Sequence, residues 1–322
     1  MNNYLIVIVG PTAIGKTALS IKLAQHFGCD ILSCDSRQFF KEMKIGTAVP
    51  NETELAASNH HFIQNKSIFE NYTVGDFEKE AISKLKELFK ENNIQIVVGG
   101  SGLYVNAILQ GFDDFPEVSN EIRENVRNQY EEKGLEFLQN KLKELDSNYY
   151  ATLLNENPQT LQNPQRMMRF VEVCLASDLP YSSFLNQKKN QRNFIPIVIG
   201  LEAEREIMYN RINQRVDNMM NDGLLEEAKR VYPNKTLNAL QTVGYRELFD
   251  YFDERKQSSK VESSEDYRLL GNAIEQIKMN TRRFAKRQLT WFKRNENTIW
   301  FDFQTENSKI INTISEKIKN AN

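Results

Sequence analysis

Residues 10–17 of the 322-residue chain read Gly10-Pro11-Thr12-Ala13-Ile14-Gly15-Lys16-Thr17. An apolar run, Tyr4–Val9, precedes these residues, and a helical pattern, Ala18–Gln25, follows them. A strand, a G-x-x-x-x-G-K-T loop and a helix together predict a phosphate-binding loop. The glycines let backbone amides turn toward anionic oxygens, and the helix N-terminus adds partial positive charge.

Two side chains give this loop its chemistry. Lys16 supplies a positive charge to the terminal phosphates, and the Thr17 hydroxyl can hold Mg²⁺. We therefore predict that all eight residues, from Gly10 to Thr17, bind a polyphosphate or pyrophosphate ester, and that Thr17 is a metal ligand. A glycine-containing turn that binds nothing is the alternative, which the strand–loop–helix context disfavours. The loop alone leaves the identity of the ester open.

Composition limits the possible classes of protein. Hydrophobic residues make up 40% of the chain, the formal net charge is −2, and no apolar run is long enough to span a membrane. The first predicted strand begins so soon after Met1 that no room remains for a signal peptide. Cys29, Cys34 and Cys174 are too few and too scattered for a disulfide framework or a zinc site. We therefore expect a cytoplasmic protein.

Further strands are predicted at Asp30–Cys34, Ile94–Val98 and Phe194–Leu201, with helical patterns between them. This alternation predicts an α/β fold, a P-loop NTPase-like parallel sheet with helices on both faces. Asp35 follows the first of these strands. A carboxylate at the carboxyl end of a strand beside a phosphate loop lies where such sheets bind ligands.

Two local features lie between these strands. Asp76 is predicted to cap a helix that ends near Phe89 and carries an apolar stripe. His60 and His61 are adjacent, so their side chains point apart, and no carboxylate or cysteine completes a metal site. We expect the histidine pair to pack in a loop, with metal ligation as the alternative.

The pattern changes near Asp113, after which only helical patterns occur until about Arg192. The sequence therefore predicts three parts: a first core segment at 1–112, an all-helical insertion at 113–192, and a second core segment at 193–322. In the insertion, Asn163-Pro164 predicts a helix start. The apolar face of that helix comprises Met167, Phe170, Val171, Cys174 and Leu175, and the polar face comprises Gln165, Arg166, Arg169 and Glu172. The polar face suits a lid as well as an RNA-binding surface.

The second core segment carries basic helices. Arg211 and Arg215 are four residues apart and share one helix face. The last predicted helix ends with Thr281–Arg294, where six basic residues alternate with Phe284, Trp291 and Phe292. This mixture is typical of an RNA- or phosphate-binding face. A solvated helix that docks through its aromatic residues is the alternative. Residues Gln257–Lys260 are predicted to be a surface loop.

Taken together, the motifs resemble those of the tRNA dimethylallyltransferases, also called tRNA isopentenyltransferases. The resemblance covers nearly the whole chain and rests on Gly10–Thr17, Asp35-Ser36-x-Gln38, Met43-x-Ile45-Gly46-Thr47-Ala48-x-Pro50, His60-His61, Val98–Tyr104, Pro164-Gln165-Arg166-x-x-Arg169, Arg215, Val243–Glu247 and Thr281–Trp291. Departures from the family pattern are Phe40, Val49, Gln64, Ser101 and Asn163, none of them in the phosphate loop. No zinc-finger tail is present, so the chain looks like the bacterial form.

The resemblance implies an enzyme that transfers a dimethylallyl group from dimethylallyl diphosphate to N6 of the adenosine 3′ of the anticodon, position 37 of tRNA. It implies Asp35 as the group that takes the amine proton, with Thr17 and Arg215 as catalytic partners that stabilise the departing pyrophosphate. Thr12 would reach the diphosphate or the base pocket. Ligation of a Mg²⁺-bound water is the alternative role for Asp35. Mg²⁺ is the implied cofactor, and a monomer is expected.

The resemblance also implies a set of residues that bind the anticodon stem-loop. The target base has to be flipped out to reach a buried centre, and Gln38 would read the adenine or its neighbours. The implied tRNA-binding residues are Asp35, Ser36, Arg37, Gln38, Ser101, Arg123, Gln165, Arg166, Met167, Met168 and Arg169.

Two other functions use the same loop. One is a phosphate-loop kinase of a small metabolite, and the other is a non-catalytic, RNA-binding ATP switch. The long insertion and the basic helix offer more surface than a small substrate needs. The run Ile96–Val98 ends in Gly99-Gly100, where an ATP switch would place an acidic Mg²⁺ ligand.

Overall fold

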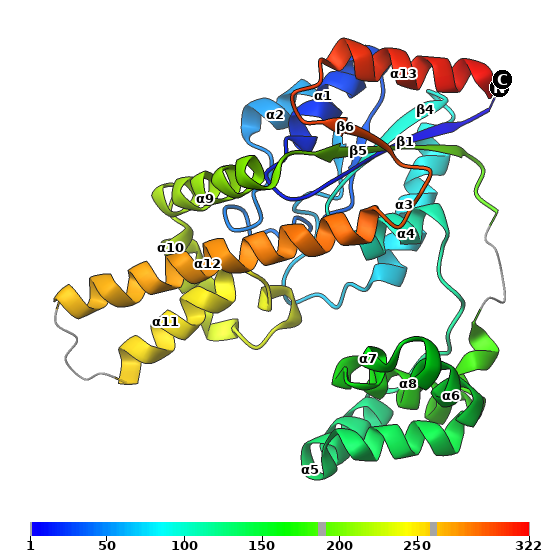
Figure 1. The fold of residues 1–322 in the computed structure, drawn as a ribbon, viewed down its shortest axis with the longest axis vertical. Coiled ribbons are helices and arrows are strands. Elements are labelled where there is room, and N and C mark those ends of the chain that lie inside the picture. Colours follow the sequence, from blue (N-terminus) through cyan, green and yellow to red (C-terminus); the bar gives the residue numbers. More distant parts are fainter. Residues whose placement is uncertain (1, 186–190, 258–262, 322) are drawn as a thin grey trace. The chain divides into compact units, whose positions relative to one another are not determined.

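A computed structural model describes residues 2–185, 191–257 and 263–321. Its centre is a six-stranded sheet with the order β3-β2-β4-β1-β5-β6, in which each pair of neighbouring strands is parallel (Figure 1). The strands are β1 (Tyr4–Val9), β2 (Ile31–Ser33), β3 (His60–His61), β4 (Ile94–Val98), β5 (Ile195–Glu202) and β6 (Ile299–Asp302). The α/β prediction is confirmed.

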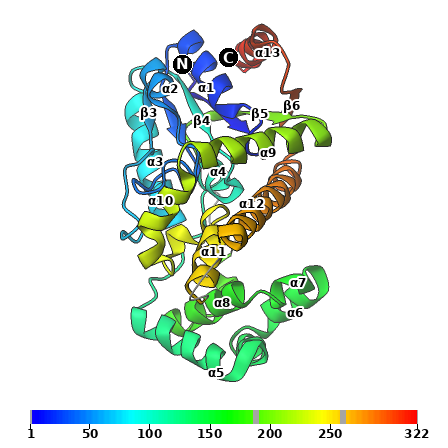
Figure 2. The same ribbon diagram turned by 90° about the vertical axis from the view of Figure 1, so that its left-hand side faces the viewer.

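Helices cover both faces of the sheet because alternate side chains of a strand point to opposite faces. The even-numbered residues of β1 share a core with α1 and α13, and the odd-numbered ones share a core with α3 and α4. Figure 2 shows α1 and α13 side by side. These helices are α1 (Lys16–Phe27), α3 (Val74–Leu88), α4 (Gly102–Leu109) and α13 (Asn307–Asn320).

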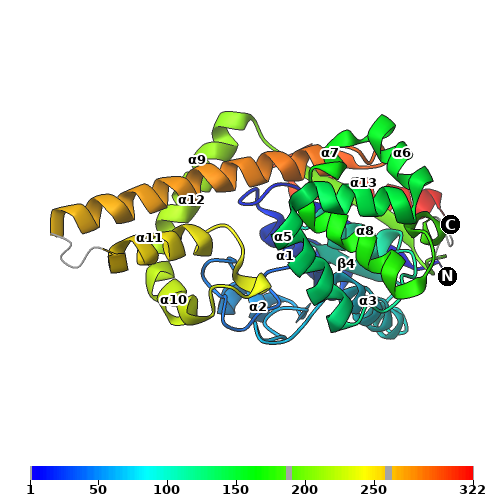
Figure 3. The ribbon, with the colours of Figure 1, turned by 90° about the horizontal axis from the view of Figure 1, so that it is seen from below.

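A third apolar core lies among the helices that follow β5 (Figure 3). It joins these helices to the loop that carries Phe40 and Met43. The long helix α12 packs against both α9 and α11. The elements of this region are α9 (Arg205–Asn221), α10 (Leu224–Val231), α11 (Tyr245–Gln257), α12 (Ser263–Phe292) and the 3₁₀ turns Tyr232–Asn234 and Asn238–Leu240. The short helix α2 (Glu52–Ala57) packs against α1 instead.

The chain forms two compact units, one comprising residues 1–109 and 192–322 and the other 110–191. Helices are the only regular structure among the described residues of the second unit, which begins with an irregular segment up to residue 119 and has its own apolar core. Asn163 caps its last α-helix by accepting a hydrogen bond from the Arg166 amide at 3.2 Å. Its elements are α5 (Asn120–Leu145, kinked at Gly134), α6 (Ser147–Glu156), α7 (Pro158–Leu161), α8 (Pro164–Ser177) and the 3₁₀ turn Tyr181–Phe184.

The structure corrects several details of the predicted elements. The chain does not end its regular structure with the basic helix, because β6 and α13 follow it. The cap of α3 is Thr73, and Asp76 is the third helical residue, whose carboxylate accepts a hydrogen bond from the Thr73 amide at 2.9 Å. Leu175 is 36% exposed and lies outside the apolar face of α8, while Val173 is buried.

The histidine pair and the predicted surface loop are the next two features to compare with the structure. The histidine pair does not lie in a loop: it forms β3, and His61 pairs with Asp30 at 2.8 Å. The loop predicted at Gln257–Lys260 falls mainly on 258–260, outside the described residues. Among the helices of the described chain, none is both long and apolar enough to cross a membrane.

Candidate active site

The phosphate loop leaves β1 at the carboxyl edge of the sheet, beside the ends of β2 and β4. Gly10 has φ of 145°, and a Cβ at this position would lie 2.6 Å from the Leu201 carbonyl oxygen. Gly15 has φ of 110° and precedes the first residue of α1. A side chain at either position would be strained, so the loop needs glycine there. The backbone therefore wraps a space at the N-terminus of α1, where anions bind favourably.

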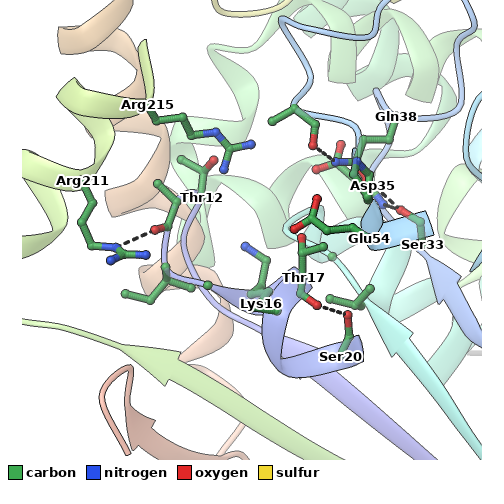
Figure 4. Close-up of a pocket in the computed structure, with 18 of the residues that line it drawn as sticks. Thr12, Lys16, Thr17, Ser20, Ser33, Asp35, Gln38, Glu54, Arg211 and Arg215 are labelled. Atoms are coloured by element: carbon green, nitrogen blue, oxygen red, sulfur yellow. Dashed lines mark hydrogen bonds between the residues drawn. The ribbon is translucent and has the colours of Figure 1, made fainter. Parts of the chain in front are cut away.

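Lys16 reaches into this space. Its amine donates hydrogen bonds to the carbonyl oxygens of Gly10 at 3.0 Å and Pro11 at 2.7 Å. Burial, with the nearby Arg215 guanidinium, lowers the pKa of Lys16 to about 8, and Asp35 opposes this shift. Burial also lowers the pKa of Arg215. Figure 4 shows the Lys16 amine pointing toward the space between Arg215 and Glu54. Two cations held close together here are suited to a polyanion.

Asp35 lies just after β2, at the same edge. Its Oδ1 accepts a hydrogen bond from the Arg37 amide at 3.1 Å, which fixes the carboxylate in a turn. Oδ2 has no hydrogen-bond partner within the described chain. The Ser101 hydroxyl accepts from the Ser36 amide and donates to the Ser36 hydroxyl, each at 3.1 Å. The turns after β2 and β4 are thus joined, and one carboxylate oxygen is left to take a proton.

Gln38 makes three hydrogen bonds within the protein, through both ends of its side-chain amide. Its NH₂ group donates to the carbonyl oxygens of Thr47 at 3.1 Å and Ala48 at 2.9 Å. Its Oε1 accepts from the Ser33 hydroxyl at 3.1 Å. Because both donors of the amide are used within the protein, only the second lone pair of Oε1 is left to meet an adenine, and the reading role of Gln38 stays a prediction.

Arg37 and Arg211 also make contacts to the protein backbone. The Arg37 guanidinium donates to the carbonyl oxygens of Asn238 at 2.9 Å and Ala239 at 3.0 Å. Arg211 donates to the Ala13 carbonyl at 2.9 Å, which ties α9 to the phosphate loop (Figure 4). Each arginine therefore holds two segments of the site together and also contributes a positive charge.

Gln288 on α12 belongs to the site, although the sequence marked it only as part of a basic motif. Its Oε1 accepts from the Thr12 amide at 2.9 Å, and its Nε2 donates to the Gly100 carbonyl at 2.8 Å. The side chain is buried. It therefore joins the phosphate loop to the turn after β4. No sequence signal identifies such a bridge, since its three members are far apart in the chain.

Two cavities open on this edge of the sheet. One, of about 680 Å³, contains the phosphate loop from Thr12 to Thr17. The other, of about 570 Å³, is lined by apolar and polar residues of α9, α12 and the turns after β2 and β4. Residues that line both cavities are Thr12, Asp35, Arg215, Phe284 and Gln288. A ligand in each cavity could therefore meet the other beside the Asp35 carboxylate.

Oxygen donors for a metal lie in the larger cavity. Thr17 and the carboxylates of Asp35 and Glu54 all line it. Hard oxygen donors of this kind suit Mg²⁺, which usually takes one or two protein ligands and completes its shell with phosphate oxygens and water. The described residues contain no cluster of three His, Cys, Asp or Glu side chains that could hold a metal. The donor set thus fits Mg²⁺ that arrives with a diphosphate, and Glu54 is a candidate that the sequence did not indicate.

The helical unit holds the other predicted tRNA-binding residues. Arg123, Gln165 and Arg166 are exposed, and Met168 and Arg169 are half-buried. The Arg169 guanidinium lies 5.8 Å from the centre of the Phe115 ring. Met167 was predicted to bind tRNA, but its side chain is fully buried in the apolar core of this unit. The prediction for Met167 is therefore wrong, because the residue belongs to the apolar face of α8.

Most of the basic side chains at the end of α12 and directly after it are exposed to solvent. Arg283, Lys286, Arg287 and Arg294 are exposed, whereas Arg282 is half-buried and donates to Asn213 at 2.6 Å. Phe284 is 39% exposed beside these cations. An aromatic ring among cations is an arrangement that nucleic acids bind.

Comparisons with known proteins point to one family. A family model described as IPP transferase matches residues 38–295. The chain is 67% identical to a tRNA dimethylallyltransferase of Flavobacterium psychrophilum over 317 residues, which cover 98% of this chain and 99% of the relative. A relative of the same name from Flavobacterium johnsoniae is also 67% identical, over 99% of both chains. The solved tRNA isopentenylpyrophosphate transferase of Bacillus halodurans is 32% identical with a TM-score of 0.69, and covers 99% of this chain and 98% of its own.

Proposed function

This chain belongs to the IPP transferase family, and we propose that dimethylallyl diphosphate is its donor and position 37 of tRNA its target. Like the tRNA dimethylallyltransferases that it matches over nearly its whole length, it transfers a dimethylallyl group to a tRNA adenosine. The kinase and ATP-switch alternatives are therefore set aside. The acceptor atom in our proposal is N6 of the adenosine 3′ of the anticodon.

The observation that carries the proposal is the meeting of the two cavities at Asp35. The cavity around Lys16 suits a diphosphate, since it combines backbone amides, a helix N-terminus and two cations. The second cavity, with Trp291 and Tyr104 in its wall, suits a flipped base. Donor and acceptor would thus reach the same carboxylate from different sides.

In the proposed reaction, adenine N6 forms a bond to C1 of the dimethylallyl group while the bond from C1 to the diphosphate oxygen breaks. The N6 proton passes to the Asp35 carboxylate and then to solvent, and pyrophosphate leaves. An exocyclic adenine amine is a poor nucleophile because its lone pair is delocalised into the ring. A carboxylate that removes the proton helps by ~10²–10⁴-fold.

Negative charge on the leaving pyrophosphate has to be stabilised. Lys16 is held before the reaction by its contacts to Gly10 and Pro11, so it needs little reorganisation, and Arg215 adds a second positive charge nearby. The Thr17 hydroxyl, with Asp35 and Glu54 nearby, would hold Mg²⁺ brought by the diphosphate. When bound, Mg²⁺ neutralises charge on the phosphate oxygens.

The remaining proposals concern how tRNA is bound, where the enzyme works and its oligomeric state. The exposed cations of α12 and those of the helical unit would contact phosphates of the anticodon stem-loop. The flipped adenosine would be bordered by the turns after β2 and β4, which carry Ser36, Arg37 and Ser101. An enzyme that acts on tRNA and a diphosphate ester would work in the cytoplasm, and we propose that it acts as a monomer.

The test is a transfer assay on defined RNA. Purified protein is incubated with an unmodified tRNA transcript, dimethylallyl diphosphate and Mg²⁺, and the digested RNA is examined by mass spectrometry. We expect one dimethylallyl group on the adenosine 3′ of the anticodon, equal amounts of pyrophosphate, and no gain when that adenosine is replaced by guanosine. Modification at another adenosine, or none, would contradict the proposal.

A further inference from the structure

Glu227 on α10 is a carboxylate with no part in the site described so far. Only 2% of its surface is exposed, and within the described chain it forms no ion pair. Burying a charge without a counter-charge is unfavourable unless hydrogen bonds replace its hydration. The hydrogen bonds of the Glu227 carboxylate therefore have to replace its hydration.

Both oxygens of Glu227 accept hydrogen bonds from one loop. Oε2 accepts from the amides of Lys44 at 3.0 Å and Ile45 at 2.9 Å. Oε1 accepts from the amides of Ile45 at 3.0 Å and Gly46 at 2.9 Å, and from the Tyr245 hydroxyl at 2.6 Å. Three consecutive amides thus converge on one side chain, and this convergence fixes the course of residues 43–48.

Tyr245 closes the arrangement from the other side. Burial, together with the Glu227 carboxylate, raises the pKa of its phenol, so the hydroxyl stays protonated and donates. A Cβ at Gly46 would lie 2.6 Å from the Tyr245 ring. The loop is therefore packed against the ring as tightly as glycine permits.

This loop leads to the reacting centre through hydrogen bonds. The carbonyl oxygens of Thr47 and Ala48 hold the Gln38 amide, whose Oε1 accepts from the Ser33 hydroxyl. The Ser33 hydroxyl in turn accepts from the Asp35 amide at 3.4 Å. Glu227 is thereby connected to the backbone of Asp35. The same loop lines both cavities, with Thr47 in the smaller and Ala48 in the larger.

We propose that Glu227 is a positioning residue for the transfer reaction: it fixes the loop 43–48 and, through Gln38, the backbone of Asp35. The inference rests on the proposed function, in which Asp35 takes the adenine proton. Glu227 touches neither substrate. Its effect arises because a reacting group displaced by about 1 Å can cost up to ~10²-fold in rate.

The test compares Glu227→Gln with Glu226→Gln, which makes the same chemical change at the exposed neighbour on α10. A glutamine at 227 turns its NH₂ group toward at least one amide donor, so the loop loses its anchor. Single-turnover transfer is measured by mixing a stoichiometric enzyme–tRNA complex with saturating dimethylallyl diphosphate. We expect the rate constant of Glu227→Gln to fall by about tenfold or more, and that of Glu226→Gln to stay at the wild-type value. Affinity for pyrophosphate should not change, because the contacts of Lys16 do not run through Glu227.

The rate constant separates positioning from folding, because unfolded protein lowers the amplitude and leaves the rate constant unchanged. A rate constant for Glu227→Gln equal to that of Glu226→Gln overturns the inference. A double-mutant cycle with Gln38→Met adds a second criterion: coupled effects support the connection through Gln38, and additive effects contradict it. Should Glu227→Gln fail to fold, Glu227→Asp keeps the charge but is one methylene too short to hold all three amides, and its unchanged rate constant would also overturn the inference. A wild-type protein that modifies no adenosine would instead refute the proposed function.

Discussion

The charge of Lys16 depends on its surroundings in the folded protein. Its amine is placed in the phosphate loop by two backbone carbonyls and near a second cation, Arg215. The sequence predicted Lys16 as a phosphate ligand from the loop motif alone. The lowered pKa depends on burial and on α9, which the motif cannot reveal.

A pH dependence of diphosphate binding follows from that pKa of about 8. Below this value free Lys16 is protonated and attracts the diphosphate; above it the amine is increasingly neutral. Affinity for pyrophosphate should therefore fall as the pH rises through 8, because binding then requires proton uptake. Titration calorimetry of wild-type protein and Lys16→Met separates this effect from the titration of pyrophosphate itself. We expect the variant to bind weakly with a flatter pH dependence, and parallel slopes would contradict the assignment.

Other residues of the site could be predicted only in part. Asp35 was identifiable because a carboxylate ended a predicted strand beside the loop. Glu54 and Gln288 were not, because the fold alone brings Glu54 into the cavity wall and joins Gln288 to distant segments. Outside the site, Glu227 could not be identified either, since it holds a loop that is far away in the sequence. Gln38 was assigned to the adenine from a motif, whereas its actual partners are carbonyl oxygens of the following loop.

At the scale of helices and strands, hydrophobic periodicity predicted the buried elements well. β1 and β4 have the predicted bounds because they are short, mainly apolar runs in the centre of the sheet. β6 was missed because it has only four residues and lies at an edge, where pairing with β5 decides its structure. α13 was missed although Ile310 and Ile314 are one turn apart and buried.

The start of α3 gives a prediction about stability. The Thr73 hydroxyl accepts a hydrogen bond from the Asp76 amide at 3.2 Å and satisfies a donor that the helix leaves unpaired. We expect Thr73→Ala to lower the free energy of unfolding by ~1 kcal/mol, and Thr73→Ser to keep most of it. Denaturant unfolding followed by circular dichroism measures both. Equal stability of the alanine and serine variants would show that the hydroxyl does not cap the helix.

α9 brings Arg215 to the point where the two cavities meet. We expect Arg215→Ala to reduce kcat by ~10²–10³-fold, because one fixed donor to the developing negative charge is removed. Its effect on the KM for dimethylallyl diphosphate should be smaller, since Lys16 and the loop amides remain. Arg205→Ala removes the same charge from an exposed position of α9 and should act as the wild type. Equal kinetics for the two variants would exclude Arg215 from the transition state.

At the scale of the whole molecule, the insertion is a separate unit with its own core, between two segments of one α/β fold. The sequence placed it through the loss of strand patterns after Asp113. Which of its faces binds RNA could not be predicted fully, because a helical periodicity assigns Met167 to the core but does not say which exposed side chains meet a partner.

The salt dependence of tRNA binding tests whether the helical unit contacts tRNA phosphates. Counterions are released when cations neutralise phosphates, so affinity falls as salt rises. The slope of log affinity for tRNA against log salt concentration measures this effect. We expect Arg166→Ala/Arg169→Ala to flatten it by up to about one unit for each phosphate that the variant no longer neutralises. Binding of pyrophosphate should not change. Lys317→Ala/Lys319→Ala removes the same charge from α13 and should keep the wild-type slope. A lid that covers only the diphosphate would give the opposite result: weaker pyrophosphate binding and an unchanged slope for tRNA.

Donor and acceptor meet at the Asp35 carboxylate in the proposed reaction, so Asp35→Asn is the decisive variant. The change is nearly isosteric and removes the base. The measurement is the single-turnover rate of dimethylallyl transfer, with the dissociation constant of tRNA determined on the same samples. We predict a rate lower by ~10²-fold or more with tRNA affinity almost unchanged. A rate near that of the wild type, or a loss of tRNA affinity that matches the loss of rate, would contradict the claim.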